Sequence, residues 1–179
     1  MNALRIFWVL IAIFLAGCGD QAEDAKQGVS SDRQVAGSAL DRKAVAAGIL
    51  PDAENLVFGG RYETRSDLGT DKFCSVKNGA KQYAIGALAV FGPESKCEAR
   101  GTATISGERV KISLSGKGNC SFDAEFDGVE LRFPGALEKE CETYCTPRAS
   151  FTGTSYFIVE QGAENARRAL GRDFEKLCP

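Results

Sequence analysis

The sequence predicts a mainly β domain, a small antiparallel barrel or sandwich of about seven to eight strands with a C-terminal α-helix and disulfide staples. Three observations predict this class. Short segments with alternating apolar and polar residues run from Gly59 to Phe157, and two pairs of them flank hairpin turn signals. Six cysteines lie in or beside this region. Apolar residues at helical spacing end the chain.

Two hairpins can be placed by register. Asp127-Gly128 is typical of a two-residue type I′ turn, and a turn at Gly107-Glu108 fits a second hairpin. In both registers the apolar residues share one face, as a buried sheet face requires. The expected opposite pairs are Phe126 with Val129, Ala124 with Leu131, Phe122 with Phe133, Asp123 with Arg132 and Glu125 with Glu130 in the first hairpin, and Ile105 with Val110, Ala103 with Ile112 and Gly101 with Leu114 in the second.

The remaining elements follow from the same patterns. Further strands are expected over residues 60–65, 72–77, 83–91 and 148–158. A helix is expected at the end of the chain, and its apolar stripe would pack on the sheet. A short helix capped by Ser38 is expected over residues 38–47. The stripe of the terminal helix consists of Ala163, Ala166, Leu170, Phe174 and Leu177.

The N-terminus has the pattern of an export signal. Arg5 is its one charge, and an apolar run from Ile6 to Ala16 follows. A helix of about 11 residues would span roughly 16 Å, which is about half the hydrocarbon core of a bilayer. The run therefore fits the core of a signal peptide rather than a membrane-spanning helix.

The string Leu15-Ala16-Gly17-Cys18 resembles the lipobox of bacterial lipoproteins. The resemblance implies that Cys18 receives a diacylglyceryl group, that cleavage precedes it, and that its new amine is acylated, giving a firm anchor of several chains. The alternative is an ordinary secretory signal with a chance cysteine at the cleavage site. Gly19 rather than Asp follows Cys18, which favours the outer membrane over the inner membrane in such lipoproteins.

The predicted organisation has three parts: a signal peptide over residues 1–17, a lipidated N-terminus and flexible tether with a short helix over 18–54, and the β domain over 55–179. Cleavage before Cys18 removes one of 22 Lys and Arg residues and none of 24 Asp and Glu residues. The formal net charge therefore becomes one unit more negative than −2. A net negative charge disfavours nucleic-acid binding, which needs a basic surface.

The cysteines are interpreted as a disulfide framework, because an even number in an exported chain favours pairing. A zinc site is the alternative, but no CxxC and no histidine completes a ligand set. An up-and-down order of strands would gather all six at one end. The pairing stays open among 15 possibilities, with Cys178 expected to join Cys141 or Cys145. The six are Cys74, Cys97, Cys120, Cys141, Cys145 and Cys178.

The chain contains no histidine, which removes the commonest general base and metal ligand. No catalytic motif, cofactor site or metal site is predicted. Glu125 and Glu130, near Asp123 and Asp127, are candidate binding residues for calcium or for paired acid–base chemistry; the alternative is a solvated face relieved by Arg132. Arg148 is a candidate to grip an anion, or else a strand residue with a solvated charge.

These observations predict a non-enzymatic binding or structural role in the periplasm-facing envelope of a Gram-negative bacterium. The partner would be an envelope protein or small ligand, besides the membrane itself. Gly59-Gly60-Arg61-Tyr62 resembles the opening of lipocalin- and avidin-like barrels, and the chain is similar in kind to lipid-anchored lysozyme inhibitors. The latter resemblance implies inhibition of a cell-wall hydrolase as an alternative function. A carboxylate-dependent enzyme is the second alternative.

Overall fold

The computed structural model describes residues 39–50, 52 and 55–179, which fall into two units divided between Leu50 and Pro51. In the first unit a helix covers residues 39–46, close to the predicted bounds. Gly48 follows with a φ of 69°, the left-handed conformation in which helices commonly end at glycine. The predicted cap Ser38, the signal peptide and Cys18 lie outside the described residues.

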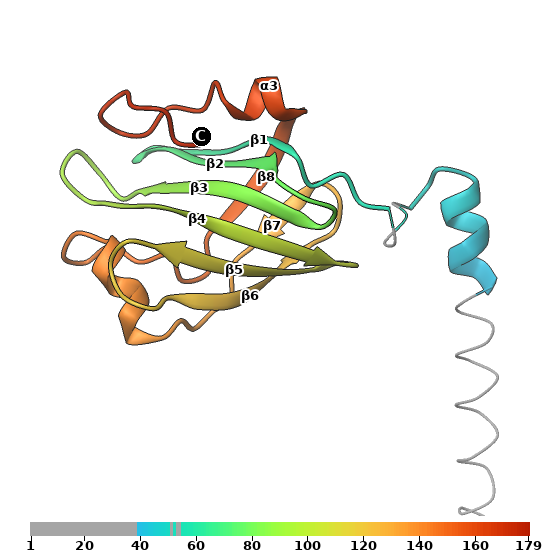
Figure 1. Ribbon diagram of the computed structural model, residues 1–179, viewed down its shortest axis with the longest axis horizontal. Helices are drawn as coiled ribbons and strands as arrows, with labels where there is room; N and C mark the ends of the chain where they lie inside the picture. The colour runs from blue at the N-terminus through green and yellow to red at the C-terminus, as the bar shows by residue number, and fades with distance from the viewer. Residues whose placement is uncertain (1–38, 51, 53–54) are drawn as a thin grey trace, which may run out of the picture. The chain divides into compact units, whose positions relative to one another are not determined.

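The second unit is a closed antiparallel barrel of eight strands in which each strand pairs with the next and β8 pairs with β1 (Figure 1). The barrel is therefore the correct alternative and the sandwich is not. Up-and-down pairing buries one face of every strand and leaves no unpaired edge. The strands are β1 (Gly60–Ser66), β2 (Gly69–Lys77), β3 (Gln82–Val90), β4 (Lys96–Ser106), β5 (Arg109–Ser115), β6 (Ser121–Phe126), β7 (Glu130–Arg132) and β8 (Ser155–Gln161).

The hairpin between β4 and β5 confirms the predicted register. Ile105 lies opposite Val110, Ala103 opposite Ile112, and Gly101 opposite Leu114. Gly107 takes a φ of 62°, as a tight primed turn requires.

The register predicted for the hairpin between β6 and β7 is wrong by two residues. Glu125 lies opposite Arg132, and Phe126 lies opposite Leu131. The cause is Asp127, whose carboxylate accepts the backbone N–H groups of Val129 and Glu130, both at 2.8 Å, and so widens the turn. A shift of two keeps the apolar residues inside, since side chains alternate along a strand. It also replaces a Glu–Glu pair by an opposite-charge pair.

The barrel interior is filled by aromatic side chains. Phe58, just before β1, closes one end and contacts Tyr83 edge-on at a centroid distance of 5.1 Å. Its carbonyl oxygen accepts the hydroxyl hydrogens of Tyr62, at 2.6 Å, and of Ser75. Burial raises the pKa of both Tyr62 and Tyr156 well above the usual range. The buried rings are those of Phe58, Tyr62, Phe73, Tyr83, Phe126, Phe133, Phe151 and Tyr156.

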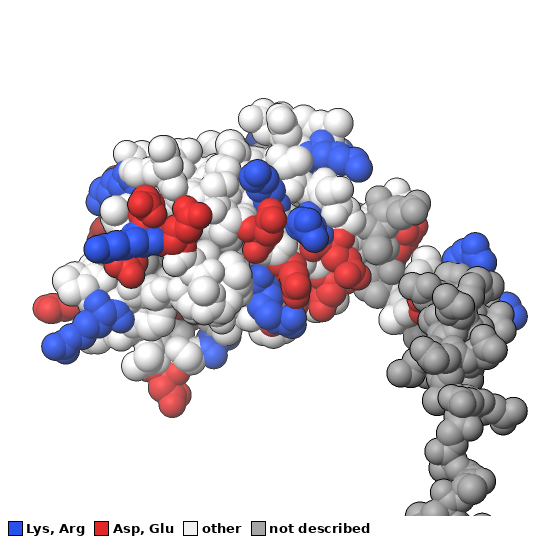
Figure 2. Space-filling view, turned by 90° about the horizontal axis from the view of Figure 1, so that it is seen from below, with Lys and Arg blue, Asp and Glu red and all other residues white. Residues whose placement is uncertain are grey.

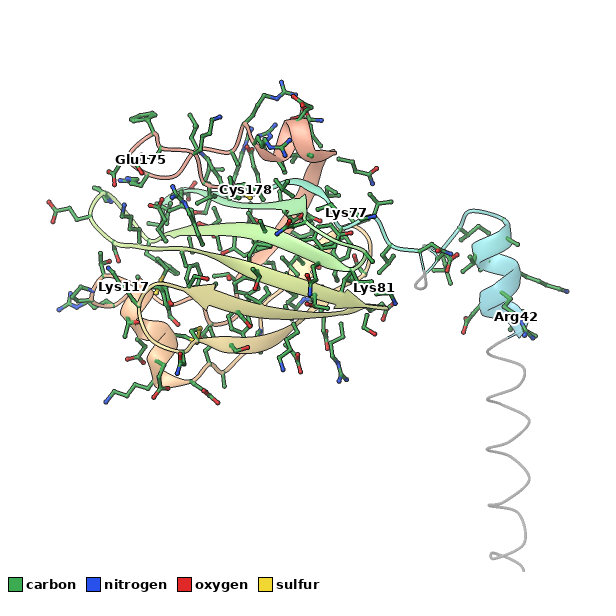
Figure 3. The ribbon with its side chains drawn as sticks, in the orientation of Figure 1. Arg42, Lys77, Lys81, Lys117, Glu175 and Cys178 are labelled. Carbon is green, nitrogen blue, oxygen red and sulfur yellow. A yellow bond between two sulfur atoms is a disulfide. The ribbon has the colours of Figure 1, made fainter. Side chains whose placement is uncertain are left out.

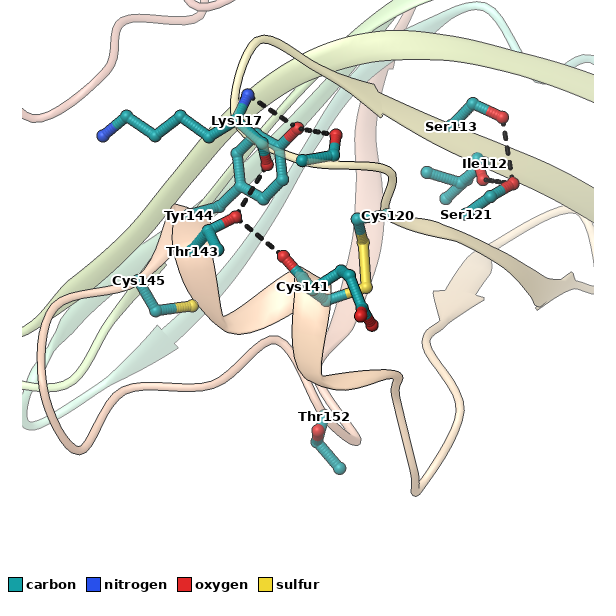
Figure 4. The surroundings of a disulfide bond; sticks show 12 residues. Ile112, Ser113, Lys117, Cys120, Ser121, Cys141, Thr143, Tyr144, Cys145 and Thr152 are labelled. Carbon is teal, nitrogen blue, oxygen red and sulfur yellow. Dashed lines mark hydrogen bonds between the residues drawn. A yellow bond between two sulfur atoms is a disulfide. The ribbon is translucent and has the colours of Figure 1, made fainter.

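The six predicted cysteines form three disulfides: Cys74–Cys178, Cys97–Cys145 and Cys120–Cys141. Two of them bind the 3₁₀ helix η1 (Lys139–Tyr144) and its end to the starts of β4 and β6. Near the Cys120–Cys141 disulfide, the Thr143 hydroxyl donates to the Lys117 carbonyl, and the Tyr144 hydroxyl accepts the Lys117 N–H (Figure 4).

Cys178 joins Cys74, so the expected partner, Cys141 or Cys145, is wrong. Cys74 lies within β2 and belongs to an apolar cluster on the outer wall with Leu88 and Leu177. The prediction that all six cysteines gather at one end is therefore also wrong for this pair. The return path of the C-terminal segment differs from the predicted one, because that segment is not a long helix.

The C-terminal helix α3 (Ala163–Ala166) is a single turn, shorter than predicted. Residues 167–179, here called the C-terminal strap, then run along the outer wall of the barrel (Figure 1). Leu177 is buried as the helical stripe required, whereas Phe174 is 84% exposed. Gly171 lies against Glu98 and opens a turn that interrupts the helical pattern. None of the helices in the described ranges has the length and hydrophobicity needed to cross a membrane.

Candidate functional site

A charged groove of about 850 Å³ lies where the β4–β5 and β6–β7 turns meet the outer face of β6. Its position follows from the registers, since Arg109 pairs with Glu125 and Glu125 pairs with Arg132. Figure 2 shows the side of the barrel below the view of Figure 1, where acidic and basic side chains gather over part of the surface. The charged residues that line the groove are Glu108, Asp123, Glu125, Asp127 and Glu130, with Arg109 and Arg132.

Arg132 organises the carboxylates of the groove. Its guanidinium donates to Glu130 at 2.6 Å and lies 3.7 Å from Glu125. The Ser155 hydroxyl and Arg132 both donate to Glu130, and these bonds hold the pKa of Glu130 below its usual range. Glu130 is mostly covered, whereas the Glu125 carboxylate is 81% exposed. The groove therefore has one carboxylate fixed by hydrogen bonds, that of Glu130, and one that is largely exposed and only loosely paired with Arg132, that of Glu125.

Asp127 contributes a second fixed charge. Partial desolvation acts to raise its pKa, but the N–H groups of Glu130 and Val129 outweigh it, so the pKa of Asp127 lies below its usual range. Asp127 is exposed at the turn between β6 and β7. Two carboxylates with lowered pKa values remain ionised at neutral pH. Because five carboxylates face two guanidinium groups, the groove is suited to a cationic group.

The structure brings Glu125 and Glu130 together, although not as the predicted facing pair, because Glu130 lies opposite Phe157 of β8. Glu108 and Arg109 belong to the same groove and were not predicted as site residues. Their turn was placed correctly, but the sequence offers no signal for the register in which β5 pairs with β6. The described residues include no group of three or more His, Cys, Asp or Glu that could hold a metal ion.

Arg148 does not belong to the groove. It lies in an exposed turn near Cys97–Cys145, at the other end of the barrel, and not in a strand as predicted. Its φ is 72°, a left-handed conformation that strands do not adopt. The last strand begins only at Ser155, because the preceding segment turns through Gly153, whose N–H donates to the Pro134 carbonyl.

One further carboxyl group is half-buried. Asp71 of β2 accepts the backbone N–H of Val90 at 2.7 Å. Desolvation raises the pKa of Asp71 and outweighs this hydrogen bond. Asp71 is not part of the groove.

A scan of the chain against protein-family models finds no match, and comparisons with curated proteins and with solved structures find none either.

Proposed function

We propose that this chain is an envelope lipoprotein of a Gram-negative bacterium, held by an acylated Cys18 and facing the periplasm, with a non-enzymatic binding role. The outer membrane is favoured, because Gly19 follows Cys18. One observation carries the anchor. Leu15-Ala16-Gly17-Cys18 ends an apolar run of signal-peptide length, while every other cysteine is paired. Three disulfides agree with an exported protein, since disulfides persist in oxidising compartments.

The binding role takes place on the outer surface of the barrel. Its interior is occupied by packed aromatic rings, among them Phe58, Phe73 and Phe133, which leaves ligand contact to the surface. The charged groove offers ionised carboxylates, and a cationic side chain or ligand is its chemical complement.

The mass of the intact protein from native membranes tests the anchor. We expect a chain that begins at Cys18, with the mass of acyl chains added, and six thiols that become alkylated only after reduction. A Cys18→Ser variant should lack the acyl mass and leave the membrane fraction. A chain that retains Met1, or thiols that react without reduction, would contradict the proposal.

A titration of the non-lipidated Cys18→Ser chain tests the groove. Tetralysine should shift the amide resonances of residues 123–132, and tetraglutamate should not. The effect should weaken in an Asp123→Asn, Glu125→Gln double variant, because both carboxylates line the groove. Equal shifts with both peptides would contradict electrostatic recognition at this surface.

A further inference from the structure

A second groove, of about 290 Å³, lies at the mouth of the barrel, at the end where Phe58 closes the interior. It is formed by the segment that enters the barrel, the β2–β3 turn and the start of the β4–β5 turn. We call it the mouth groove. Its apolar wall includes Leu56 and Ile105, and its polar side chains are those of Asn55, Lys77, Lys81 and Tyr83.

Strand alternation places two lysines at this mouth. Lys77 lies directly opposite Tyr83 in the pairing of β2 with β3, so the two side chains leave the same face of the sheet. That face is the inner one, because Tyr83 belongs to the core. Lys81 lies two residues before Tyr83, and its carbonyl accepts the Ile105 N–H at 3.1 Å, so the same alternation gives it the inner face. Figure 3 shows Lys77 and Lys81 at this end of the barrel and Lys117 at the other.

Tyr83 adds a hydroxyl that has no protein partner. Its ring packs edge-on against Phe58, and the residue is only 7% exposed. The neighbouring Tyr62 donates to the Phe58 carbonyl, whereas the Tyr83 hydroxyl makes no hydrogen bond within the part of the chain that the structure describes. Tyr156 alone among those residues has a fully covered polar side-chain atom without a partner, so the Tyr83 hydroxyl keeps contact with the groove. Burial raises the pKa of Tyr83, which keeps this hydroxyl protonated and able to donate.

The two lysines of the mouth groove are not neutralised by carboxylates. Neither Lys77 nor Lys81 takes part in an ion pair with any residue of the described ranges, and no described Asp or Glu lines the groove. Of the described acidic residues close in sequence, Asp52 accepts the side-chain amide of Asn55. Glu108 lines the charged groove beside Arg109. The mouth groove therefore presents donors and positive charge, and its chemical complement is an anion.

We infer that the mouth groove binds the phosphate group of a phosphate monoester. Such a group carries a charge of about −1.5 to −2 at neutral pH, which matches two ammonium groups without a partner. Lys77 and Lys81 would attract the phosphate as point charges, and the Tyr83 hydroxyl would donate a hydrogen bond to it. Leu56 and Ile105 offer apolar contact to the organic part of the ligand. Mouths of β-barrels are common positions for ligand sites.

This site goes beyond the proposed function, because it depends neither on the lipid anchor nor on the charged groove. A soluble phosphate ester and the headgroup of a phosphatidic acid lipid share the required chemistry. The tether leads into the barrel at Leu56, beside the mouth groove, so either source can reach the site.

Titration of the Cys18→Ser chain with glycerol phosphate tests the site. Amide resonances of residues 77–83 should shift, and glycerol alone should not shift them. Lys77→Gln should weaken the binding of glycerol phosphate about tenfold, because one charge-assisted hydrogen bond is lost. The matched control is Lys117→Gln, which removes an exposed lysine at the opposite end of the barrel and should leave the affinity unchanged.

Tyr83→Phe separates ligand binding from folding. The variant keeps the ring contact with Phe58 and loses a hydroxyl that no protein group binds, so it should unfold at the same or a higher temperature. Its affinity for glycerol phosphate should fall about tenfold. Tyr62→Phe should behave in the opposite way, because it loses the bond to the Phe58 carbonyl and leaves the groove intact.

Vesicles separate the two sources of the phosphate group. If the source is a lipid, the Cys18→Ser chain should sediment more with phosphatidylcholine vesicles that contain phosphatidic acid than with phosphatidylcholine alone. Glycerol phosphate and the Lys77→Gln, Lys81→Gln double variant should each abolish that difference. If the source is a soluble ester, the vesicles should show no difference while glycerol phosphate still shifts residues 77–83.

Three results would overturn the inference: no shift of residues 77–83 with either glycerol phosphate or phosphatidic acid, an unchanged affinity in the double variant, or an equal loss in Lys117→Gln. The tetralysine titration reports on residues 123–132 and the intact mass reports on the anchor. Failure of the mouth groove is therefore distinguishable from failure of the proposed function.

Discussion

Replacing Cys74 and Cys178 together by alanine is expected to lower the free energy of unfolding by about 4 kcal/mol. The bond joins residues 104 positions apart, but Cys97–Cys145 shortens the covalent path between them to about 56 residues. Loop-closure entropy for a path of that length gives roughly 4 kcal/mol at 25 °C. Both sulfurs are buried, so the small void left by alanine adds to the loss.

Urea unfolding at 25 °C measures this loss, and the matched control is the Cys120→Ala, Cys141→Ala pair. That bond closes a loop with a separation of 21, for which the same relation gives about 3 kcal/mol. Removing Cys74–Cys178 should therefore cost more than removing the control bond. If the loss in free energy of unfolding is equal to or smaller than that of the control, the entropic reasoning is refuted. The strap would then be held in place mainly by its apolar contacts and hydrogen bonds.

Three further changes test the packing and the titration of the barrel. Gly86→Ala would bring a Cβ against the Leu177 carbonyl and should cost about 1–3 kcal/mol in urea unfolding, whereas Gly59→Ala, with its nearest contact at 3.7 Å, should cost less. Asp127→Ala loses two exposed hydrogen bonds and should lower the free energy of unfolding by about 1 kcal/mol at pH 7. Because folding lowers the pKa of Asp127, this loss should vanish as the pH falls through the pKa of Asp127 in the folded protein. Asp71→Asn should raise the melting temperature at pH 7, because folding raises the pKa of Asp71 and its ionised form therefore destabilises the folded protein. The gain in melting temperature should disappear below the ordinary pKa of Asp, where Asp71 is protonated in both states. A gain that persists at that pH would contradict this explanation.

The strands were predictable because their information is local. The period-2 pattern and the Gly107-Glu108 turn were sufficient to place β4 against β5 residue by residue. The β6–β7 register was missed because a single side chain decided it. Asp127 bonds to the backbone of its own turn, and a dipeptide preference for Asp-Gly does not report that bond.

The C-terminal segment was mispredicted for a different reason. Ala163, Ala166 and Leu177 have helical spacing and are in fact inward-facing or buried, so the pattern correctly identified contact with the sheet. Tertiary contacts determined the backbone conformation, which is not helical after Ala166, because Gly171 packs closely against Glu98 and Cys178 is bonded to Cys74 of β2. The groove combines residues from four strands and two turns, and no pattern within one segment could have assembled it.

Two neighbouring residues of β2 hold both ends of the barrel domain. Ser75 points inward and bonds to the Phe58 carbonyl, where the chain enters, while Cys74 points outward and bonds covalently to Cys178, where it ends. A force applied to the C-terminal strap would therefore reach β2 directly through a covalent bond, whereas a force on the entering chain would reach β1 first, because the backbone runs from Phe58 into β1 and the Ser75 contact is one hydrogen bond.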